Sequence, residues 1–319
     1  MKTKTHSSVQ DSLFFVIDQA VHLLREVPAN VLALYFTGSV PFVLAALYFW
    51  SEMSRSPFAL EYASGASLAL AILFIWMKFW HALFSVRLRE FIAQESPQAW
   101  TVKRLWNLLI VQAALQPSRL IVLPVALLVM IPFGWVYAFY ENISVIGNGQ
   151  SPRLAPVIQR SWNLALLWPK PNHVLIWLLS PFMLVSTVVF AMSMSYVLPL
   201  ISPHVTTAPD QILFGMALIF LVLILPLSPL GMILLTNIIL TLFALPYLLR
   251  ALFGVETLFT ISGLHLFNTT FIVTACALTF LCLDPLLKAA YALRCFYGDS
   301  LTSGDDLRLS LQAIQKESR

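Results

Sequence analysis

Apolar runs of about 20 residues recur along the chain between residues 28 and 297. An α-helix rises about 1.5 Å per residue, so about 20 residues cross the roughly 30 Å hydrocarbon core of a bilayer. Runs such as 120–140 lack the period-two alternation that a membrane-spanning β-strand needs. Since only helices and closed barrels satisfy their backbone groups in lipid, the pattern predicts an all-α, polytopic transmembrane helical bundle.

Eight spans are predicted from these runs, within a range of six to eight. Their approximate bounds are 29–50, 65–86, two within 105–146, 174–198, 212–226, 230–249 and 267–287. The stretch 105–146 suits two crossings with a turn near residues 131–134. Two crossings keep the flanking lysines and arginines on one side of the membrane, as the positive-inside rule requires, whereas one crossing would separate them. We therefore predict a hairpin there, and the number of crossings within 105–146 and within 212–249 stays open.

The distribution of charge predicts the orientation of the chain. With both termini in the cytoplasm, only Arg55 and Arg250 of the nineteen lysines and arginines fall in external loops. Lys78 and Arg119 fall within spans, and the other fifteen face the cytoplasm, which follows the positive-inside rule. The predicted domains are a cytoplasmic amphipathic N-terminal segment at 1–28, a transmembrane domain at 29–287 and a cytoplasmic C-terminal tail at 288–319.

Composition agrees with a membrane protein and excludes other classes. Hydrophobic residues make up 59% of the chain and charged residues 11%, and the mean hydropathy is +0.82. The spans leave no room for a separate soluble domain of about 100 residues or more. The net charge of +4 follows from the cytoplasmic bias rather than from a basic face, so no nucleic-acid partner is predicted. The polar start of the chain lacks a signal-peptide pattern, and we expect it to be uncleaved.

Two terminal segments have the periodicity of amphipathic helices. Residues 11–26 form the first, with an apolar face made of Phe14, Ile17, Val21 and Leu24. We expect this helix to lie in the headgroup plane before the first span. The second follows a capping-box pattern at residues 303–306, with an apolar stripe made of Leu307, Leu311 and Ile314. A short amphipathic helix should therefore close the chain.

A third amphipathic segment covers residues 153–168. Its apolar stripe consists of Leu154, Ile158, Trp162, Ala165 and Leu166, and another side carries Arg153, Arg160 and Asn163. Tryptophan suits the headgroup level and arginine binds lipid phosphates, so we predict a helix at the cytoplasmic interface. The predicted headgroup contacts are Lys78, Arg153, Arg160, Trp162 and Trp168. For Lys78, which lies inside the second span, a partner in the bundle interior is the alternative to snorkelling.

An intramembrane polar cluster is the strongest candidate site, because charges inside a bilayer are costly. Gln112, Gln116 and Arg119 recur at i, i+4 and i+7 and therefore share one side of a helix. Glu141 lies at a depth where it can meet Arg119 across the predicted hairpin. Two interpretations remain open: a structural ion pair with glutamines that hold two helices together, or a polar path or binding cleft.

No residue pattern points to catalysis. The histidines occur singly, and the sequence contains no His-x-x-x-His, Glu-x-x-His, Gly-x-Ser-x-Gly or phosphate-binding glycine loop. Cys276, Cys282 and Cys295 do not have the spacing of a zinc site. Asp284 and Lys288, at i and i+4, are interpreted as a local pair at the end of the last span. We therefore predict no catalytic residues, no metal site and no cofactor.

One segment resembles a family of bacterial multi-pass proteins. The sequence GNGQSPRLAPVIQRSWNLALLWPKP is similar to a small-residue loop followed by Ala/Val-x-x-Arg-Ser-Trp-x-Leu in proteins related to the membrane domain of glycerophosphoryl diester phosphodiesterases. Three other segments occur in the order in which that family has its elements: HLLREVPANVLAL, MIPFGW and AAYALRCFYGDSLTSGDDL. The resemblance implies a helical membrane domain, which some members join to a catalytic barrel that this chain is too short to include. It implies no activity here, and the apolar residues from 212 to 249 depart from the family pattern.

These observations predict a non-enzymatic integral protein of the bacterial inner membrane, acting as an anchor, scaffold or accessory subunit. The expected partners are the lipid bilayer and a protein in the membrane or at its cytoplasmic face. A small transporter or lipid-handling protein that uses the polar cluster is the alternative, and a membrane-embedded hydrolase comes third. A polar cavity open around Arg119 would favour transport, whereas a sealed hairpin with an exposed apolar groove would favour the scaffold.

Overall fold

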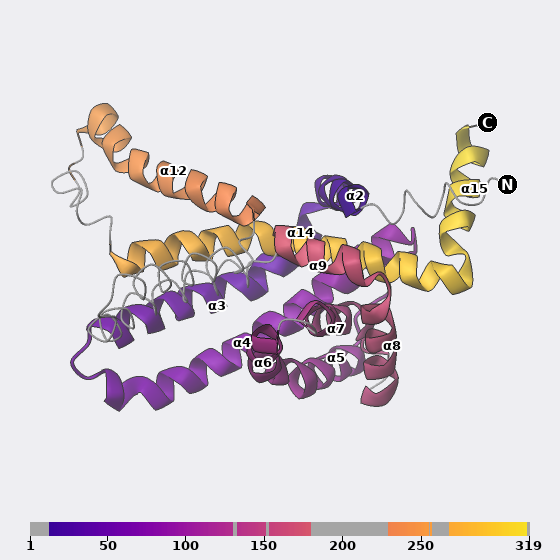
Figure 1. The fold of residues 1–319 in the computed structure, drawn as a ribbon, viewed down its shortest axis with the longest axis horizontal. Helices are drawn as coiled ribbons and strands as arrows, with labels where there is room; N and C mark the ends of the chain where they lie inside the picture. Colours follow the sequence, from indigo (N-terminus) through magenta and orange to yellow (C-terminus); the bar gives the residue numbers. More distant parts are fainter. Residues whose placement is uncertain are drawn as a thin grey trace, which may run out of the picture. The chain divides into compact units, whose positions relative to one another are not determined.

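The computed structural model describes residues 13–129, 133–150, 153–179, 229–254, 256 and 268–317, and every regular element in these ranges is helical (Figure 1). The elements are α2 (Leu13–Glu26), α3 (Ala29–Arg55), α4 (Ala59–Ile92), α5 (Val102–Leu115), the 3-10 turn η1 (Gln116–Ser118), α6 (Arg119–Val129), α7 (Phe133–Ile146), α8 (Leu154–Leu166), α9 (Pro169–Leu179), α12 (Pro229–Phe253), α14 (Thr269–Ser303) and α15 (Asp305–Glu317). The prediction of an all-α membrane fold is confirmed.

Five helical segments in the described ranges are long and apolar enough to cross a membrane. They are α3, α4, the continuous run Val102–Leu123, α12 and α14. These five indicate a multi-pass membrane protein, but they do not confirm the predicted count of about eight. Helix α7, the expected second half of the hairpin, has 14 residues and rises only about 21 Å, so it is too short to cross by itself. The span predicted at 212–226 and most of the one at 174–198 lie outside the described residues.

The chain divides into two compact units, Met1–Val174 with Pro285–Arg319, and Leu175–Asp284. In the second unit α12 packs against the first half of α14. The buried residues of this contact are Leu235, Ala275 and Cys276, and Ile238, Ile239, Leu242 and Ile272 pack around them. The candidate site described below lies entirely in the first unit.

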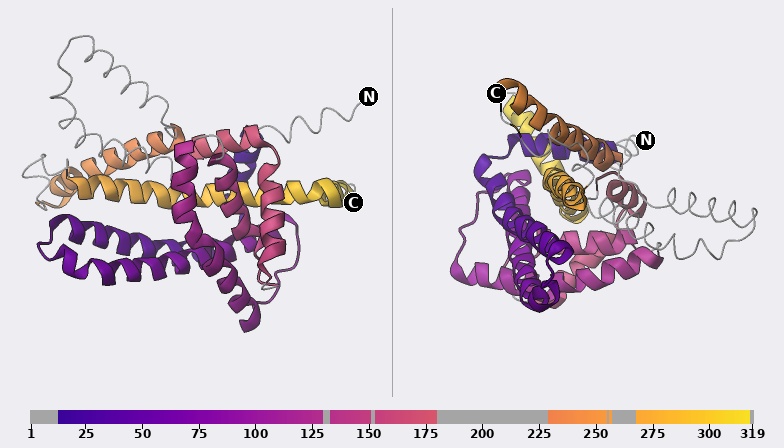
Figure 2. Two further views of the ribbon diagram at one scale, coloured as in Figure 1. Left: turned by 60° about the horizontal axis from the view of Figure 1, so that its bottom comes forward. Right: turned by 90° about the vertical axis from the view of Figure 1, so that its left-hand side faces the viewer.

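Helices α3 and α4 form a close antiparallel hairpin in the first unit (Figure 2). Gly38 lets the two backbones approach, because a Cβ atom added there would lie 2.6 Å from Trp80 Cβ and 3.1 Å from the Met77 carbonyl oxygen. The Trp76 indole donates a hydrogen bond of 3.1 Å to the carbonyl of Thr37. This small-residue contact is typical of helix packing in membranes, where the hydrophobic effect contributes little between helices.

Helices α5 to α8 run across the direction of this hairpin, as Figure 2 shows in its left view. Helix α4 packs against α5 and α7, and α7 packs against α6 and α8. The buried residues of α4 accordingly lie between Phe74 and Glu90, where these helices cover it. In its first half only one side packs against α3, and the other side stays exposed among the described residues, with Leu60 93% exposed. This exposed apolar side of α4 is therefore available to lipid, and the second half carries the core.

The three predicted amphipathic helices are present as α2, α8 and α15. Helix α2 also buries a second apolar face, which the sequence analysis did not single out. The residues packed against the protein are Val16, Ala20, Leu23 and Val27. The predicted face of Phe14, Ile17, Val21 and Leu24 remains exposed or half-buried. Helix α2 thus has two apolar faces, one that packs on the protein and one that is free to contact the bilayer.

Candidate functional site

The buried cluster is centred on Glu141 of α7. Its carboxylate is in contact with two cations: Arg119 Nη1 lies 2.7 Å from Oε1, and Lys288 Nζ lies 2.5 Å from Oε2. The two cations come from the start of α6 and the middle of α14, so three helices meet at one carboxylate. The three residues are 1% (Glu141), 9% (Arg119) and 1% (Lys288) exposed. The predicted contact between Arg119 and Glu141 is therefore formed, and Lys288 joins it.

Lys288 is the member of this cluster that sequence reasoning missed. Its spacing from Asp284 suggested only a local pair, whereas its ammonium donates a hydrogen bond to a carboxylate 147 residues away in the chain. A second cation directly after the predicted end of the last span at residue 287 was the available signal. Only the packing of α14 against α7 identifies its partner.

A 3-10 turn between α5 and α6 places the polar stripe of the cluster. Pro117 is the second residue of this turn, η1, and Ser118 Oγ lies 2.7 Å from both the Leu115 carbonyl oxygen and the Tyr140 hydroxyl. The Gln116 amide donates hydrogen bonds to the Tyr140 carbonyl and to Ser144 Oγ, at 3.2 and 3.3 Å. Gln116 therefore ties η1 to α7, next to the ion pair, as the structural interpretation of the stripe expects.

Gln112 behaves differently from the rest of the predicted cluster. Its side chain is fully buried, and among the residues that the structure describes neither its amide nitrogen nor its amide oxygen has a hydrogen-bond partner. The nitrogen faces α7 beside Gly147, where an added Cβ would lie 3.3 Å away. An unsatisfied buried amide is costly, so Gln112 is the member of the cluster that a structural role explains least.

Aromatic rings enclose the ion cluster. The Arg119 guanidinium lies 4.8 Å from the centre of the Tyr137 ring, which packs against Tyr291 at 6.2 Å. The Tyr291 hydroxyl donates to Asn172 Oδ1 at 2.7 Å, and the Asn172 amide donates to the Gly134 carbonyl at 2.6 Å. These contacts fix the rings around the cations.

Lys78 does not lie where a lipid headgroup would contact it. The residue is 5% exposed, and its ammonium lies 5.5 Å from the centre of the Phe74 ring. One turn further on, His81 Nε2 lies 2.7 Å from Ser39 Oγ, and Tyr35 stacks on the imidazole at 4.8 Å. This burial favours the bundle-interior alternative for Lys78 over a headgroup contact. Helices α5 and α7 pack against this half of α4.

Helix α8 is held to the protein through its basic side. Asp299 of α14 binds Arg160 of α8 and Arg89 of α4, each with an N–O distance of 2.8 Å. Arg160 nevertheless remains exposed, as do Arg153 and Trp162. Ile158 and Leu166 are exposed on the same stretch, whereas Ser161 and Ala165 are buried against the protein. The helix thus keeps an open apolar strip beside its arginines.

Trp168, the last of the predicted headgroup contacts, is in contact with Arg294 of α14. The guanidinium lies 5.7 Å from the centre of a Trp168 ring and donates a hydrogen bond of 3.1 Å to the Leu167 carbonyl. Trp168 has a φ of +51°, a left-handed conformation that is uncommon for a bulky residue. The contacts from Arg294 hold the end of α8 in this conformation.

The loop after α7 is held by two residues of α5 that the sequence did not single out. Arg104 Nε donates to the Asn148 carbonyl at 3.0 Å, and the Asn107 amide donates to the Gly149 carbonyl at 3.2 Å. Gly149 has a φ of +74°, and a Cβ there would lie 2.3 Å from the Arg104 carbonyl oxygen. The small residues of this loop are therefore required by its close approach to α5.

The described residues contain no group of three or more histidines, cysteines and acidic residues that would hold a metal ion. The cluster itself has one carboxylate occupied by two cations, an arrangement that joins helices and leaves no free base or nucleophile in contact with solvent. Comparisons with protein-family profiles, with curated proteins and with solved structures found no match to this chain.

Proposed function

We propose that this protein is a non-enzymatic scaffold or membrane anchor of the bacterial inner membrane, with both termini in the cytoplasm. The observation that carries this proposal is the closure of the charged cluster. Glu141 is in contact with both Arg119 and Lys288, and all three side chains are buried. A buried carboxylate shared by two cations joins three helices, whereas a transport path needs polar groups that a solute can reach.

The surfaces open to a partner lie on the amphipathic helices. Leu307, Leu311 and Ile314 of α15 are each more than 60% exposed and form one stripe on a single side of the helix. Helix α15 has three acidic and two basic residues, so it lacks the excess of lysine and arginine with which a surface helix binds anionic lipid. A protein partner at the cytoplasmic face fits this stripe better than the bilayer does. Exposed apolar strips of this kind are typical of interaction sites.

The resemblance to membrane domains related to glycerophosphoryl diester phosphodiesterases agrees with this role. In that family the membrane domain can serve a catalytic domain as its membrane-embedded part. We propose that the present chain likewise serves a separate cytoplasmic protein, through α15.

Native electrophoresis of the full chain, extracted from its own membranes in a mild detergent, tests the scaffold role. We expect the wild-type protein to migrate in a complex larger than the chain alone. Leu311→Glu places a charge in the apolar stripe and should release the chain from the complex. Ser310→Glu adds the same charge about 100° around the helix and should leave the complex intact. A wild-type chain that migrates alone, or two variants that behave alike, would contradict the proposal.

A transporter or lipid-handling protein is the second candidate, and Gln112 is the observation that favours it. A fully buried amide with no hydrogen-bond partner among the described residues would be satisfied by water or by a polar solute. The two functions differ in whether water reaches this position.

A further inference from the structure

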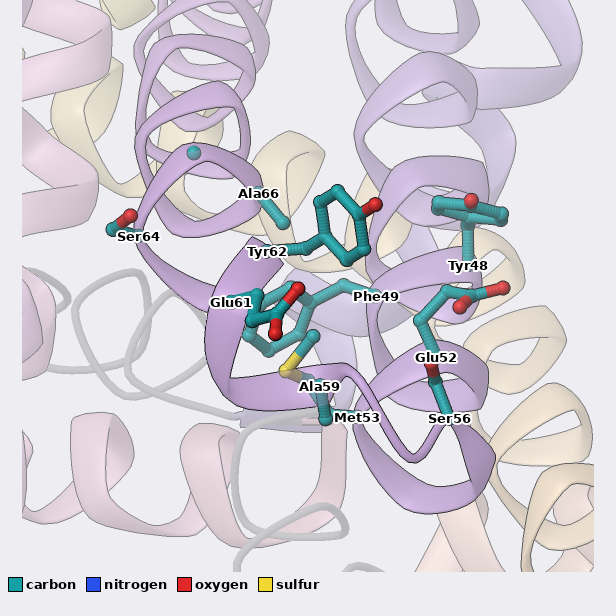
Figure 3. A pocket seen from close by; sticks show the side chains of 11 residues that line it. Tyr48, Phe49, Glu52, Met53, Ser56, Ala59, Glu61, Tyr62, Ser64 and Ala66 are labelled. Carbon is teal, nitrogen blue, oxygen red and sulfur yellow. The ribbon is translucent and has the colours of Figure 1, made fainter.

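A cavity of about 520 Å³ lies where α3 connects to α4 (Figure 3). The side chains that define its chemistry are Tyr48, Phe49, Glu52, Met53, Glu61 and Tyr62. Residues of the end of α3 line one side and residues of the first turns of α4 line the other, so the hairpin itself forms the cavity.

The cavity lies about one hydrocarbon-core thickness along α3 from the start of that helix. Tyr48 follows the start of α3 by 19 residues, which corresponds to a rise of about 29 Å, close to the thickness of the hydrocarbon core. Helix α2, which has a free apolar face, ends next to the start of α3 and marks the opposite boundary. Tyr48 and Tyr62 are both largely exposed, and tyrosine is enriched where lipid tails meet headgroups.

Two acidic residues, Glu52 and Glu61, are among the residues that line this aromatic cavity. Glu52 lies one turn after Tyr48, and Glu61 directly precedes Tyr62. Among the residues that the structure describes, neither carboxylate has an ion pair with a lysine, arginine or histidine. Part of the charge of Glu61 is stabilised by the amino end of α4. Glu52 lies near the carboxyl end of α3, where a helix disfavours negative charge, and Arg55 lies three residues further on at the same helix end.

Tyrosine rings beside carboxylates are the groups that bind an organic ammonium ion. The faces of the rings attract the cation, and the carboxylates neutralise its charge. Phe49 and Met53 offer an apolar surface for the carbon atoms attached to the nitrogen. An inorganic cation would gain little from these two residues, because it binds oxygen ligands rather than hydrocarbon.

We propose that this cavity binds an alkylammonium group, supplied by the amine headgroup of a zwitterionic phospholipid or by a free amine of the same chemistry. The position at a membrane boundary favours the lipid as the source. The proposal does not depend on the scaffold role, because it concerns the opposite end of the α3–α4 hairpin from the ion cluster.

Calorimetric titration of the full chain with butyltrimethylammonium tests this proposal. The protein is placed in nanodiscs of an uncharged glycolipid, which carries no amine. We expect saturable binding of one probe molecule per chain. Glu52→Gln and Glu61→Gln should each raise Kd about tenfold, which corresponds to about 1.4 kcal/mol. Glu95→Gln, which removes an exposed carboxylate at the other end of α4, is the matched control and should leave Kd unchanged.

Two substitutions of Tyr62 separate the contribution of its aromatic ring to binding from the contribution of its hydroxyl. Tyr62→Phe keeps the ring and should bind as the wild type does, whereas Tyr62→Leu should raise Kd at least threefold. A second titration in nanodiscs that contain phosphatidylethanolamine identifies the source. A raised apparent Kd for the probe assigns the cavity to the lipid headgroup, and an unchanged Kd assigns it to a free amine. Binding that does not saturate, or a Glu52→Gln, Glu61→Gln double variant that binds like the wild type, would overturn the proposal.

Discussion

Replacing Glu141 should destabilise the protein more than replacing either of its cations. In Glu141→Gln the Arg119 and Lys288 side chains remain buried near one another without the carboxylate that neutralises them. Removing one partner of a buried ion pair costs about 3–5 kcal/mol, and here one substitution breaks two contacts. We therefore expect a loss at the upper end, about 5 kcal/mol. Arg119→Leu should cost about 2 kcal/mol, because Lys288 still donates its hydrogen bond to Glu141.

The second cation changes what a double variant should show. Arg119→Leu combined with Glu141→Leu removes one complete pair but leaves the Lys288 ammonium buried without this carboxylate, so stability should be only partly recovered. Adding Lys288→Met removes the whole cluster, and apolar replacement of a complete buried ion group is often neutral. The triple variant should therefore be more stable than the double variant.

Unfolding of the purified full chain, titrated with a denaturing detergent in mixed micelles and followed by circular dichroism, measures these differences. Glu26→Gln is the control, because that carboxylate is exposed at the end of α2 and its loss should change the free energy of unfolding by less than about 0.5 kcal/mol. Simple addition of the losses from Arg119→Leu and Glu141→Leu would refute the coupling, and so would a Glu141→Gln variant as stable as the control.

Three further predictions concern packing and topology. Gly38→Ala should destabilise the α3–α4 hairpin by about 1–3 kcal/mol, because the added Cβ clashes with Trp80. Gly65→Ala is the control and should not destabilise the protein, because no atom lies within 4 Å of the added Cβ. Thermal unfolding of both variants measures this difference. In a background without the native cysteines, single cysteines at 154, 158 and 165 should react slowly with a water-soluble thiol reagent and those at 153, 160 and 163 quickly, and equal rates would show that α8 is simply solvated. Reporter fusions at Gly149 and at the carboxyl terminus should both indicate cytoplasm, and an external signal at Gly149 alone would mean that 105–146 crosses once.

Apolar length and helical periodicity predicted most of the individual helices. The runs at 29–50 and 230–249 correspond to α3 and α12, and the patterns at 153–168 and in the tail correspond to α8 and α15. These elements are local, because their signals come from residues within a few turns of one another. The expected depths of Arg119 and Glu141 in the membrane also predicted that these two residues meet across a hairpin.

Tertiary contacts could not be predicted in the same way. Length and charge predict two spans within 105–146, whereas the described residues hold one segment long enough to cross, Val102–Leu123, and the shorter helix α7. Helices α5 and α7 pack against the half of α4 that holds the buried Lys78, for which a headgroup contact was predicted. Lys288 is selected by the packing of α14 on α7, and no spacing in the sequence contains that information. Periodicity predicts which face of a helix is apolar but not which neighbour covers it, as α2 shows.

Access of water to Gln112 is the most direct test of the central claim that the polar cluster is sealed. Gln112→Cys, in a background without Cys276, Cys282 and Cys295, is treated with a membrane-impermeant thiol reagent from each side of oriented vesicles. Gln150→Cys, at an exposed position, is the control and should be labelled from the cytoplasmic side. The scaffold account predicts no labelling of position 112 from either side. Labelling of position 112 from either side would contradict that account and would show a water-filled path of the kind that a transporter needs.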